Sequence, residues 1–306
     1  MQKAKRFHLS AQDRRKYRTG FLLALPCLCV LALMMLLPLV RTFIYSFSKV
    51  EFPNLTTKFY GLRNFQKVLS RSELPGVIRN TFVWILCSVV LRFSLGFASA
   101  LLLNGETRRK KSIRLLVLLP WTVPSIVAAN TWRWMMQPEL GMINHLLRSI
   151  GLPSLAQNWL GSASTALGSV LLAYTWSGFP FDMMMILAGM QSIPDDLYES
   201  ARIDGANTVQ LFWHITIPSL KTIIVSVLLL EATNGLNSFD LLYTMTGGGP
   251  GGATEILGLL IHRLGFTNFD FGGASALSVL IIAIVVLIAL VYGPTQRSAA
   301  RKKGAV

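Results

Sequence analysis

A stripe of polar residues interrupts one of the apolar stretches of this 306-residue chain. Its members recur at three- and four-residue spacing, which favours one face of a helix. They are Glu231, Asn234, Asn237, Ser238 and Asp240. An asparagine amide both donates and accepts hydrogen bonds, as a sugar hydroxyl requires of its partner. The same residues can instead join helices by hydrogen bonds. We favour binding for Asn234 and Asn237, and helix joining for Glu231.

Two aromatic side chains and two further charged ones lie in other apolar stretches. Tyr174 and Trp176 can stack on a sugar ring, or simply pack in the core. Arg92 and Asp182 also fall within candidate helices, where a charge is costly and usually faces a cavity or a charged partner.

An acidic polar segment at 192–218 carries the second candidate site. Pro194 with the acids that follow it indicates the start of a short helix, and Gly205 suits the left-handed position that ends one. Asn207 and Gln210 resemble a capping box for a second helix, which we expect Pro218 to close. The segment can be an amphipathic helix pair on the membrane surface or a contact site for a partner.

Motifs for catalysis and metal binding are missing from the sequence. It contains no G-x-x-x-x-G-K-[ST] phosphate loop, so we expect no ATP site on this chain. The four histidines and three cysteines have no metal-ligand spacing. A G-x-G-x-x-G match at 247–252 follows no strand and contains Pro250, so we read it as a loop. We predict no catalytic residue, no metal site and no cofactor on the chain.

The composition identifies the class of protein whose elements must position these residues. Hydrophobic residues make up 52% and charged residues 14% of the chain, against about 25% charged in soluble domains. Six apolar segments are long enough to span a bilayer. They lie at 21–45, 78–104, 114–136, 165–191, 219–244 and 273–293. Prolines or charges interrupt the third and fourth. We therefore predict an all-α membrane protein with six transmembrane helices.

The Lys and Arg residues that flank these spans predict their orientation. Bases are concentrated before the first span, between the second and third, and after the sixth. Cytoplasmic loops carry such an excess, so both termini and the 192–218 segment are expected in the cytoplasm. The first external loop, which is also basic, conflicts with this count. The predicted division is a basic tail at 1–20, a transmembrane domain at 21–294 and a basic tail at 295–306. The sequence has no arginine-rich stripe interleaved with exposed aromatics, so we do not expect it to bind nucleic acid.

Several motifs resemble one family. The segment 199–206 reads E-S-A-R-I-D-G-A and resembles the E-A-A-x-x-x-G cytoplasmic loop of ABC importer permeases; its D-G-A form is similar to the carbohydrate branch of the maltose and glycerol-3-phosphate type. Ser200 stands where that pattern usually has Ala. The supporting motifs are N-T at 80–81, L-L-L-N at 101–104, L-P-W at 119–121, W-R-W at 132–134, G-F-P-F at 178–181, A-G-M-Q-S-I-P at 188–194 and T-G-G-G-P at 246–250. The last is typical of the first of two permease subunits.

The resemblance implies a non-enzymatic subunit of an importer in the bacterial or archaeal inner membrane. A second permease would complete the path for a sugar or oligosaccharide, two ATPase subunits would bind ATP and Mg, and an extracytoplasmic binding protein would deliver the solute. The residues that would contact the ATPase are Glu199, Ala201, Asp204, Gly205 and Ala206. In that family this part of the fifth span lines the solute site.

Two other functions compete with this interpretation. An ion-coupled secondary carrier predicts inverted repeats and paired intramembrane carboxylates. We find no convincing repeat, although Asp182, Glu231 and Asp240 are acids of the required kind. A membrane-embedded enzyme, such as a lipid-linked transferase, predicts clustered acids or histidines at a membrane face. The acids here lie in the 192–218 segment instead. A requirement for a separate ATPase distinguishes all three.

Overall fold

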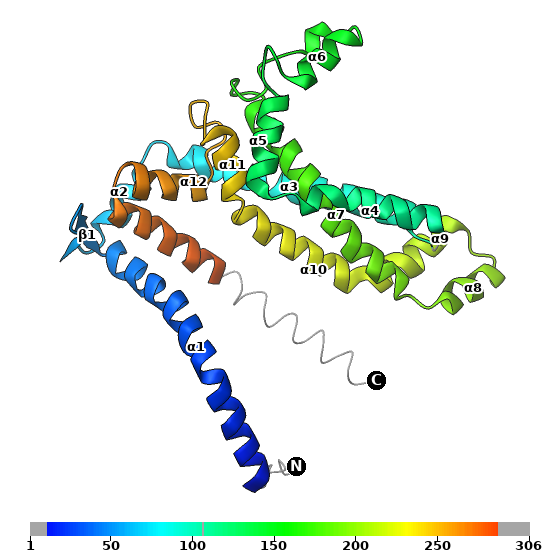
Figure 1. The fold of residues 1–306 in the computed structure, drawn as a ribbon, viewed down its shortest axis with the longest axis horizontal. Helices are drawn as coiled ribbons and strands as arrows, with labels where there is room; N and C mark the ends of the chain where they lie inside the picture. The colour runs from blue at the N-terminus through cyan, green and yellow to red at the C-terminus, as the bar shows by residue number, and fades with distance from the viewer. Residues whose placement is uncertain (1–10, 106, 287–306) are drawn as a thin grey trace. The chain divides into compact units, whose positions relative to one another are not determined.

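The computed structural model describes residues 11–105 and 107–286 (Figure 1). It divides into two compact units. We call residues up to 70 and from 264 onward the terminal unit, and residues 71–263 the central unit. The first ten residues of the predicted N-terminal tail, the end of the predicted sixth span and the predicted C-terminal tail lie outside the described residues.

The terminal unit begins with the long helix α1 (Ala11–Ser46). Its apolar part, Thr19–Ser46, has the length and hydropathy of a membrane span, and no described residue buries it. A hairpin follows, in which β1 (Ser48–Glu51) pairs antiparallel with β2 (Thr56–Phe59). The short helix α2 (Arg63–Leu69) completes this N-terminal part. A solitary hairpin needs other elements to stabilise it.

Polar contacts tie these pieces together within the terminal unit. The Asn64 side-chain amide donates to the backbone oxygens of Ser46 at 3.0 Å and Ser48 at 2.8 Å. The Lys67 ammonium lies 2.8 Å from the Asp270 carboxylate. Asp270 immediately precedes the helix Phe271–Val286. These contacts join the end of α1, the hairpin, α2 and the C-terminal helix.

The central unit is built almost entirely of helices. In chain order they are α3 (Leu74–Leu103), α4 (Arg108–Thr122), α5 (Ser125–Met135), α6 (Met142–Ser149), η1 (Pro153–Leu155), α7 (Ala166–Gln191), α8 (Asp195–Ile203), α9 (Thr208–Leu211), the π-helical turn η2 (Phe212–Thr216), α10 (Ile217–Leu236), α11 (Phe239–Thr246) and α12 (Leu257–His262). A second π-helical turn, η3 (Arg263–Thr267), begins at the last residue of the unit.

Helices α3, α7 and α10 pack against one another and form the frame of the central unit. One apolar cluster lies at the end of the frame where α3 and α7 finish and α10 starts. It includes Leu103, Met190, Ile193 and Leu220. The loop after α3 and the α8–α9 segment therefore lie at the same end, as the orientation predicted from the basic residues requires. A second cluster, which includes Trp84, Val170, Leu242 and Ile256, lies toward the other end.

The lengths of the helices confirm part of the predicted membrane topology. Four helical stretches are long and apolar enough to cross a bilayer. They are Thr19–Ser46, Leu74–Leu103, Ala166–Gln191 and Thr208–Leu236. The shorter apolar helix Phe271–Val286 lies at the predicted sixth span. The described residues therefore contain several helices suited to span a membrane, four by length and a fifth if α4 and α5 together form one span.

The third predicted span, at 114–136, is broken, as the prolines within it indicated. Helices α4 and α5 meet there at 92°. The break falls at Val123 and Pro124, both in extended conformation. A proline disfavours the helical conformation of the preceding residue and donates no backbone hydrogen bond, which accounts for the bend.

The prediction of a single fifth helix running through 219–244 is wrong. Helix α10 ends at Leu236, and α11 starts anew at Phe239. Asn237 and Ser238 occupy the break with non-helical backbone angles. Their side chains bond to nearby backbone oxygens, an alternative to the helical ladder that asparagine and serine readily adopt.

Candidate functional site

The 192–218 segment folds into the two short helices expected. Helix α8 ends at a turn in which Gly205 has a φ of +86°, the left-handed conformation predicted for it. Helix α9 begins with the predicted capping box. The Gln210 backbone N–H donates to the Asn207 side chain at 2.9 Å, and the Asn207 backbone N–H donates to the Gln210 side chain at 2.8 Å. The sequence therefore determines both ends of the turn locally.

The second helix of this segment does not stop at Pro218, as the sequence had suggested. Helices α9 and α10 form one continuous helical stretch from Thr208 to Leu236. The π-helical turn η2 precedes the proline, which occupies the first turn of α10. A π turn changes the hydrogen-bond spacing and so accommodates the missing N–H of Pro218. No loop therefore separates α9 from α10.

Apolar and polar contacts hold the α8–α9 segment against the helix frame. The Tyr198 hydroxyl lies 3.0 Å from the Thr216 hydroxyl and joins α8 to the π turn. Leu211 is buried, and the Phe212 ring packs edge-on against Phe97 of α3. Because α8 is attached on one side, its other side is available to a partner.

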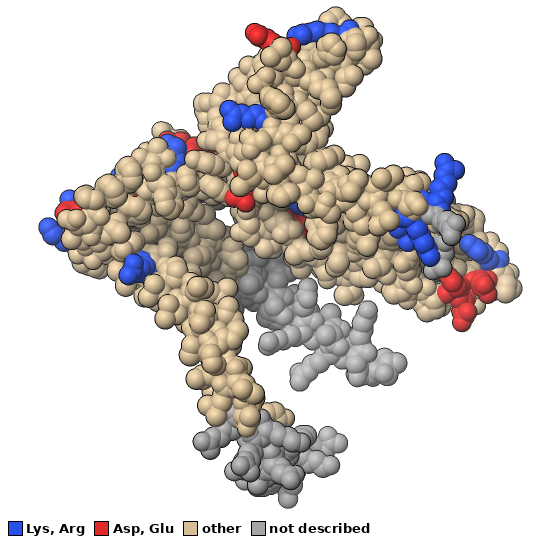
Figure 2. Space-filling model, in the orientation of Figure 1, with Lys and Arg blue, Asp and Glu red and all other residues tan. Residues whose placement is uncertain are grey.

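Four of the five predicted coupling residues line a small concavity of about 300 Å³ between α8 and α9. They are Ala201, Asp204, Gly205 and Ala206. Glu199 does not line it and is exposed on α8. Within the described residues, the side chains of Glu199 and Asp204 form no hydrogen bond or ion pair. Figure 2 shows acidic side chains gathered at the end of the central unit that carries α8, next to Lys and Arg side chains. This surface combines the exposed carboxylates of Glu199 and Asp204 with the small concavity between α8 and α9.

The polar stripe is divided among different environments. Glu231 is fully buried, and Asn234 donates to its carboxylate at 3.1 Å. Ser238 is buried and accepts a hydrogen bond of 2.6 Å from the Trp84 indole. Asn237 and Asp240 are exposed. The break after α10 causes this division, because it ends the helical periodicity that would have kept the side chains on one face.

A buried ion pair connects α10 to α3. Arg92 Nη1 of α3 lies 2.6 Å from Glu231 Oε2 of α10. The Arg92 guanidinium carbon also lies 4.6 Å from the centre of the Tyr174 ring, in the geometry of a cation–π contact. Glu231 therefore joins two helices. The sequence identified its charge as costly within a span, but it did not identify Arg92 as its partner.

The two predicted aromatic residues of α7 also contact other rings. Tyr174 packs against Trp84 of α3 with centroids 5.0 Å apart. Trp176 packs edge-on against Trp132 of α5 at 5.8 Å. Both side chains are half-buried rather than enclosed. Each therefore retains partly accessible surface.

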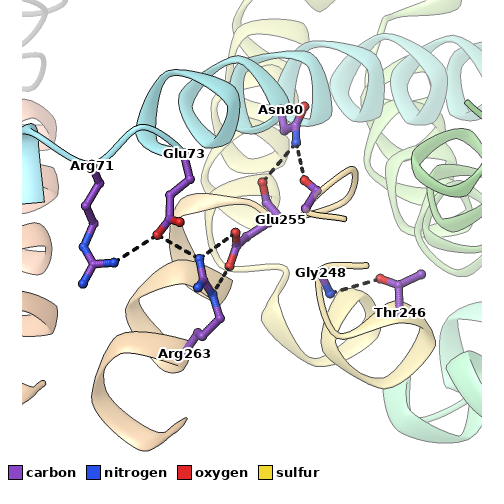
Figure 3. A network of polar contacts seen from close by, with 8 residues as sticks. Arg71, Glu73, Asn80, Thr246, Gly248, Glu255 and Arg263 are labelled. Carbon is purple, nitrogen blue, oxygen red and sulfur yellow. Dashed lines mark hydrogen bonds and ion pairs between the residues drawn. The ribbon is translucent and has the colours of Figure 1, made fainter. Parts of the chain in front are cut away.

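A polar network at the opposite end of α3 was not found by sequence reasoning (Figure 3). Arg263 Nε donates to Glu255 at 2.6 Å, and Arg263 Nη2 lies 3.0 Å from Glu73, which also accepts from Arg71. The hydrogen bonds and charge of Glu255, then those of Glu73, raise the pKa of the Arg263 guanidinium, against a lowering effect of partial burial. The network joins Glu73 to Arg263, which are 190 positions apart, so no local motif could reveal it.

The network borders an open pocket of about 920 Å³. Asn80, at the start of α3, donates to the backbone oxygens of Gly252 at 3.0 Å and Glu255 at 3.3 Å. These bonds fasten the glycine-rich segment 246–252 to α3. Two motifs that supported the family resemblance therefore lie close together in the fold: Asn80 of the N-T motif bonds to the segment that directly follows the T-G-G-G-P motif. More than 160 residues separate these motifs in the sequence.

Residues 11–105 and 107–286 contain no group of three or more His, Cys, Asp and Glu side chains that could hold a metal ion. Cys27, Cys29 and Cys87 are free thiols.

Comparisons with known proteins agree on one family. Residues 92–302 match the family model described as "Binding-protein-dependent transport system inner membrane component". The trehalose/maltose transport system permease protein MalF of Thermococcus litoralis is 37% identical over 278 residues, which cover 91% of this chain and 93% of that protein. The sulfoquinovosyl glycerol transport system permease protein SmoG of Agrobacterium fabrum is 33% identical over 272 residues, 89% of this chain and 88% of that protein.

The fold is also found in a solved structure. A bacterial ABC transporter involved in the import of the acidic polysaccharide alginate contains a chain that superposes with a TM-score of 0.82 at 21% sequence identity. The superposition covers 94% of this chain and 97% of that one. A chain of a bacterial alginate ABC transporter, solved in complex with an alginate pentasaccharide-bound periplasmic protein, superposes with a TM-score of 0.79. At this level of identity, the likeness shows a shared fold.

Proposed function

The chain belongs to the family of binding-protein-dependent transport system inner membrane components, and on that premise we propose that it is one of two permeases of an ATP-driven carbohydrate importer. The family comprises membrane subunits of transporters rather than enzymes. The observation that supports a carbohydrate is the 37% identity, across nine-tenths of the chain, to a trehalose/maltose permease. The sulfoquinovosyl glycerol permease, another relative at 33% identity, transports a sugar-containing solute according to its name.

In this proposal the α8–α9 segment contacts the ATPase. Glu199, Ala201, Asp204, Gly205 and Ala206 form the contact: the acids supply charge, the alanines supply a close-fitting wall, and Gly205 permits the tight turn. The continuous helix from α9 into α10 then carries a push at the ATPase into the spans. Two packings of those helices would alternately open the path to either side of the membrane.

The solute path runs beside the break between α10 and α11. Asn237 and Asp240 are exposed there, and their side chains can bond sugar hydroxyls. Tyr174 and Trp176 offer partly accessible rings for stacking. Asn234 and Ser238 are already hydrogen-bonded within the chain and line the path as supports. ATP and Mg bind to partner subunits, and this chain supplies no nucleotide site.

The remaining topology follows the orientation expected from the sequence. Six spans within residues 21–294 place the tails at 1–20 and 295–306, and the α8–α9 segment, in the cytoplasm. Two ATPase subunits bind there. A second permease packs beside this chain in the lipid bilayer, and an extracytoplasmic binding protein delivers the sugar from the other side. In the alginate importer's structure a periplasmic binding protein is present, which supports this last partner.

Gentle detergent purification of the chain from its native membrane, followed by mass spectrometry, tests the proposal. We expect one second permease and two ATPase subunits to accompany each copy. The complex, reconstituted in vesicles with its binding protein, should import labelled maltose, trehalose or a related sugar only when ATP is supplied. A chain that purifies alone and transports under an ion gradient without ATP would instead be a secondary carrier.

A further inference from the structure

Three charged side chains meet inside the helix frame of the central unit. Arg92 belongs to α3, Asp182 to α7 and Glu231 to α10, and each lies within a stretch long and apolar enough to span a membrane. Their exposed fractions are 6%, 0% and 0%. Charges buried to this extent are normally paired, because water no longer stabilises them.

The charges do not balance in this arrangement. Arg92 pairs with Glu231, whereas neither oxygen of Asp182 has a hydrogen-bond partner among the described residues. Arg92 Nε is also buried without a partner, and the 2.6 Å contact to Glu231 Oε2 lacks hydrogen-bond alignment. The cluster thus contains an unused donor on the arginine and an unused acceptor on the second acid.

The Arg92 guanidinium lies against Gly178 of α7, and Asp182 follows Gly178 by one helical turn. The Arg92 guanidinium occupies the space that a Cβ at Gly178 would fill, so only glycine permits it to lie against α7 there. Gly96, one turn beyond Arg92 on α3, approaches the Cβ of Asp182, one turn beyond Gly178 on α7. A turn of helix rises about 5.4 Å, a distance that the four torsions of an arginine side chain can cover.

We propose that Arg92 has two carboxylate partners, Glu231 on α10 and Asp182 on α7, and that it exchanges between them as these helices shift during transport. The proposal deepens the function above and rests on it. In the arrangement described, the arginine holds α3 to α10. In the other arrangement it holds α3 to α7, and Glu231 keeps the hydrogen bond from Asn234.

The exchange explains why an unpaired acid is kept in the frame. An acid that is paired in only one of two packings stabilises that packing over the other, and so helps to set their populations. With an acid on each helix, neither packing leaves the arginine unpaired. Arg92 and Asp182 are accordingly positioning residues for the movement and need no contact with the solute.

The test compares Asp182→Asn with Glu231→Gln in the assembled importer. Each change keeps the size of the side chain and removes one of the two partners. We expect Asp182→Asn to favour the packing held through α10, and Glu231→Gln to favour the one held through α7. The basal rate of ATP hydrolysis, measured without binding protein or sugar, should therefore change in opposite directions. We expect about fivefold in each case, the effect of a bias of about 1 kcal/mol.

The matched control is Glu51→Gln, the same acid-to-amide change in the exposed hairpin, which should leave the basal rate unchanged. Equal changes of the same sign in the two test variants, or none, would overturn the exchange and leave a purely structural ion pair.

Assembly provides a second measurement that does not depend on ATP hydrolysis. Glu231→Gln should assemble, because Asp182 takes over the arginine, whereas the double variant Asp182→Asn/Glu231→Gln should not. A single variant Glu231→Gln that fails to assemble overturns the proposal. Failure of the wild-type importer to couple ATP hydrolysis to any sugar would contradict the proposed function instead. The unfolding temperatures of Glu231→Gln and of the double variant would still test whether Arg92 exchanges partners.

Discussion

Acidic residues occur in two contrasting settings in the central unit. Asp182 and Glu231 are enclosed by α3, α7 and α10, together with a single buried cation, Arg92. Glu199 and Asp204 are exposed on the α8–α9 segment and bond to nothing within the described chain. The first pair is costly unless the protein compensates it, whereas water stabilises the second at little cost.

This difference separates the two tasks of a coupled membrane subunit. Charges that the chain pairs internally determine how its own helices pack. Charges that it leaves in solvent are available to a partner whose approach supplies the missing counter-charges. Substitutions in the two settings should therefore fail in different ways: the enclosed cluster through folding and helix packing, the exposed segment through coupling alone.

The largest effect is expected from Arg92→Met. The change leaves two carboxylates buried without a cation, and breaking a buried pair in this way costs about 3–5 kcal/mol. The purified protein should unfold at a clearly lower temperature or fail to accumulate in the membrane. Asp182→Asn, which removes the surplus acid, serves as control and should not lower the unfolding temperature. An Arg92→Met protein as stable as the wild type would erase the contrast between the two settings.

Gly205→Val comes next and acts on the exposed segment. Valine at a φ of +86° is strained by roughly 1–3 kcal/mol, although no atom lies within 4 Å of the new Cβ. The turn should distort, and ATP-driven sugar uptake should fall about tenfold or more while the amount of protein in the membrane stays normal. Gly205→Asn is the control, because asparagine tolerates this conformation. Normal uptake by the valine variant would show that the turn does not carry coupling.

Asn237→Leu probes the exposed residue at the break between α10 and α11. Loss of a hydrogen bond to the solute, worth about 1 kcal/mol, should weaken stimulation of ATP hydrolysis by the sugar-loaded binding protein roughly fivefold. Basal hydrolysis and association with the ATPase should not change. Thr233→Val, one turn earlier on the exposed side of α10, should behave as the wild type. Unchanged stimulation in Asn237→Leu would assign this residue to packing.

Glu255→Gln should produce the smallest effect. It weakens the contacts to Arg263 at the other end of α3. Glu255 is buried there but Arg263 is partly exposed, so we expect a loss of about 1 kcal/mol. A drop of a few degrees in the unfolding temperature is the expected result. Glu73→Gln, whose carboxylate is more exposed, should lower it less. A larger loss than that of Arg92→Met would reverse the ranking of enclosed and hydrated pairs.

Much of the local structure could be predicted from the residues themselves. The capping box at Asn207 and Gln210 and the left-handed turn at Gly205 were both confirmed, because they depend on groups only a few positions apart. Two breaks in long helices were not fully predicted. Pro124 was recognised as an interruption but not as a right-angle bend, and nothing local indicated that the helix would end at Leu236. The opposite error occurred at Pro218: the sequence predicted a helix end there, but the helix continues through the proline after a π turn.

The sequence by itself determined the class of protein, the family, the end of the molecule that carries the α8–α9 segment and the short-range turns within it. These properties follow from apolar length, from the distribution of Lys and Arg and from contacts between near neighbours. Only the tertiary structure decided that Arg92 lies on Glu231 rather than Asp182, and that Asn80 meets the segment at 252–255. Such pairings depend on how closely whole helices approach, which here is set by the absence of a side chain at Gly96 and Gly178.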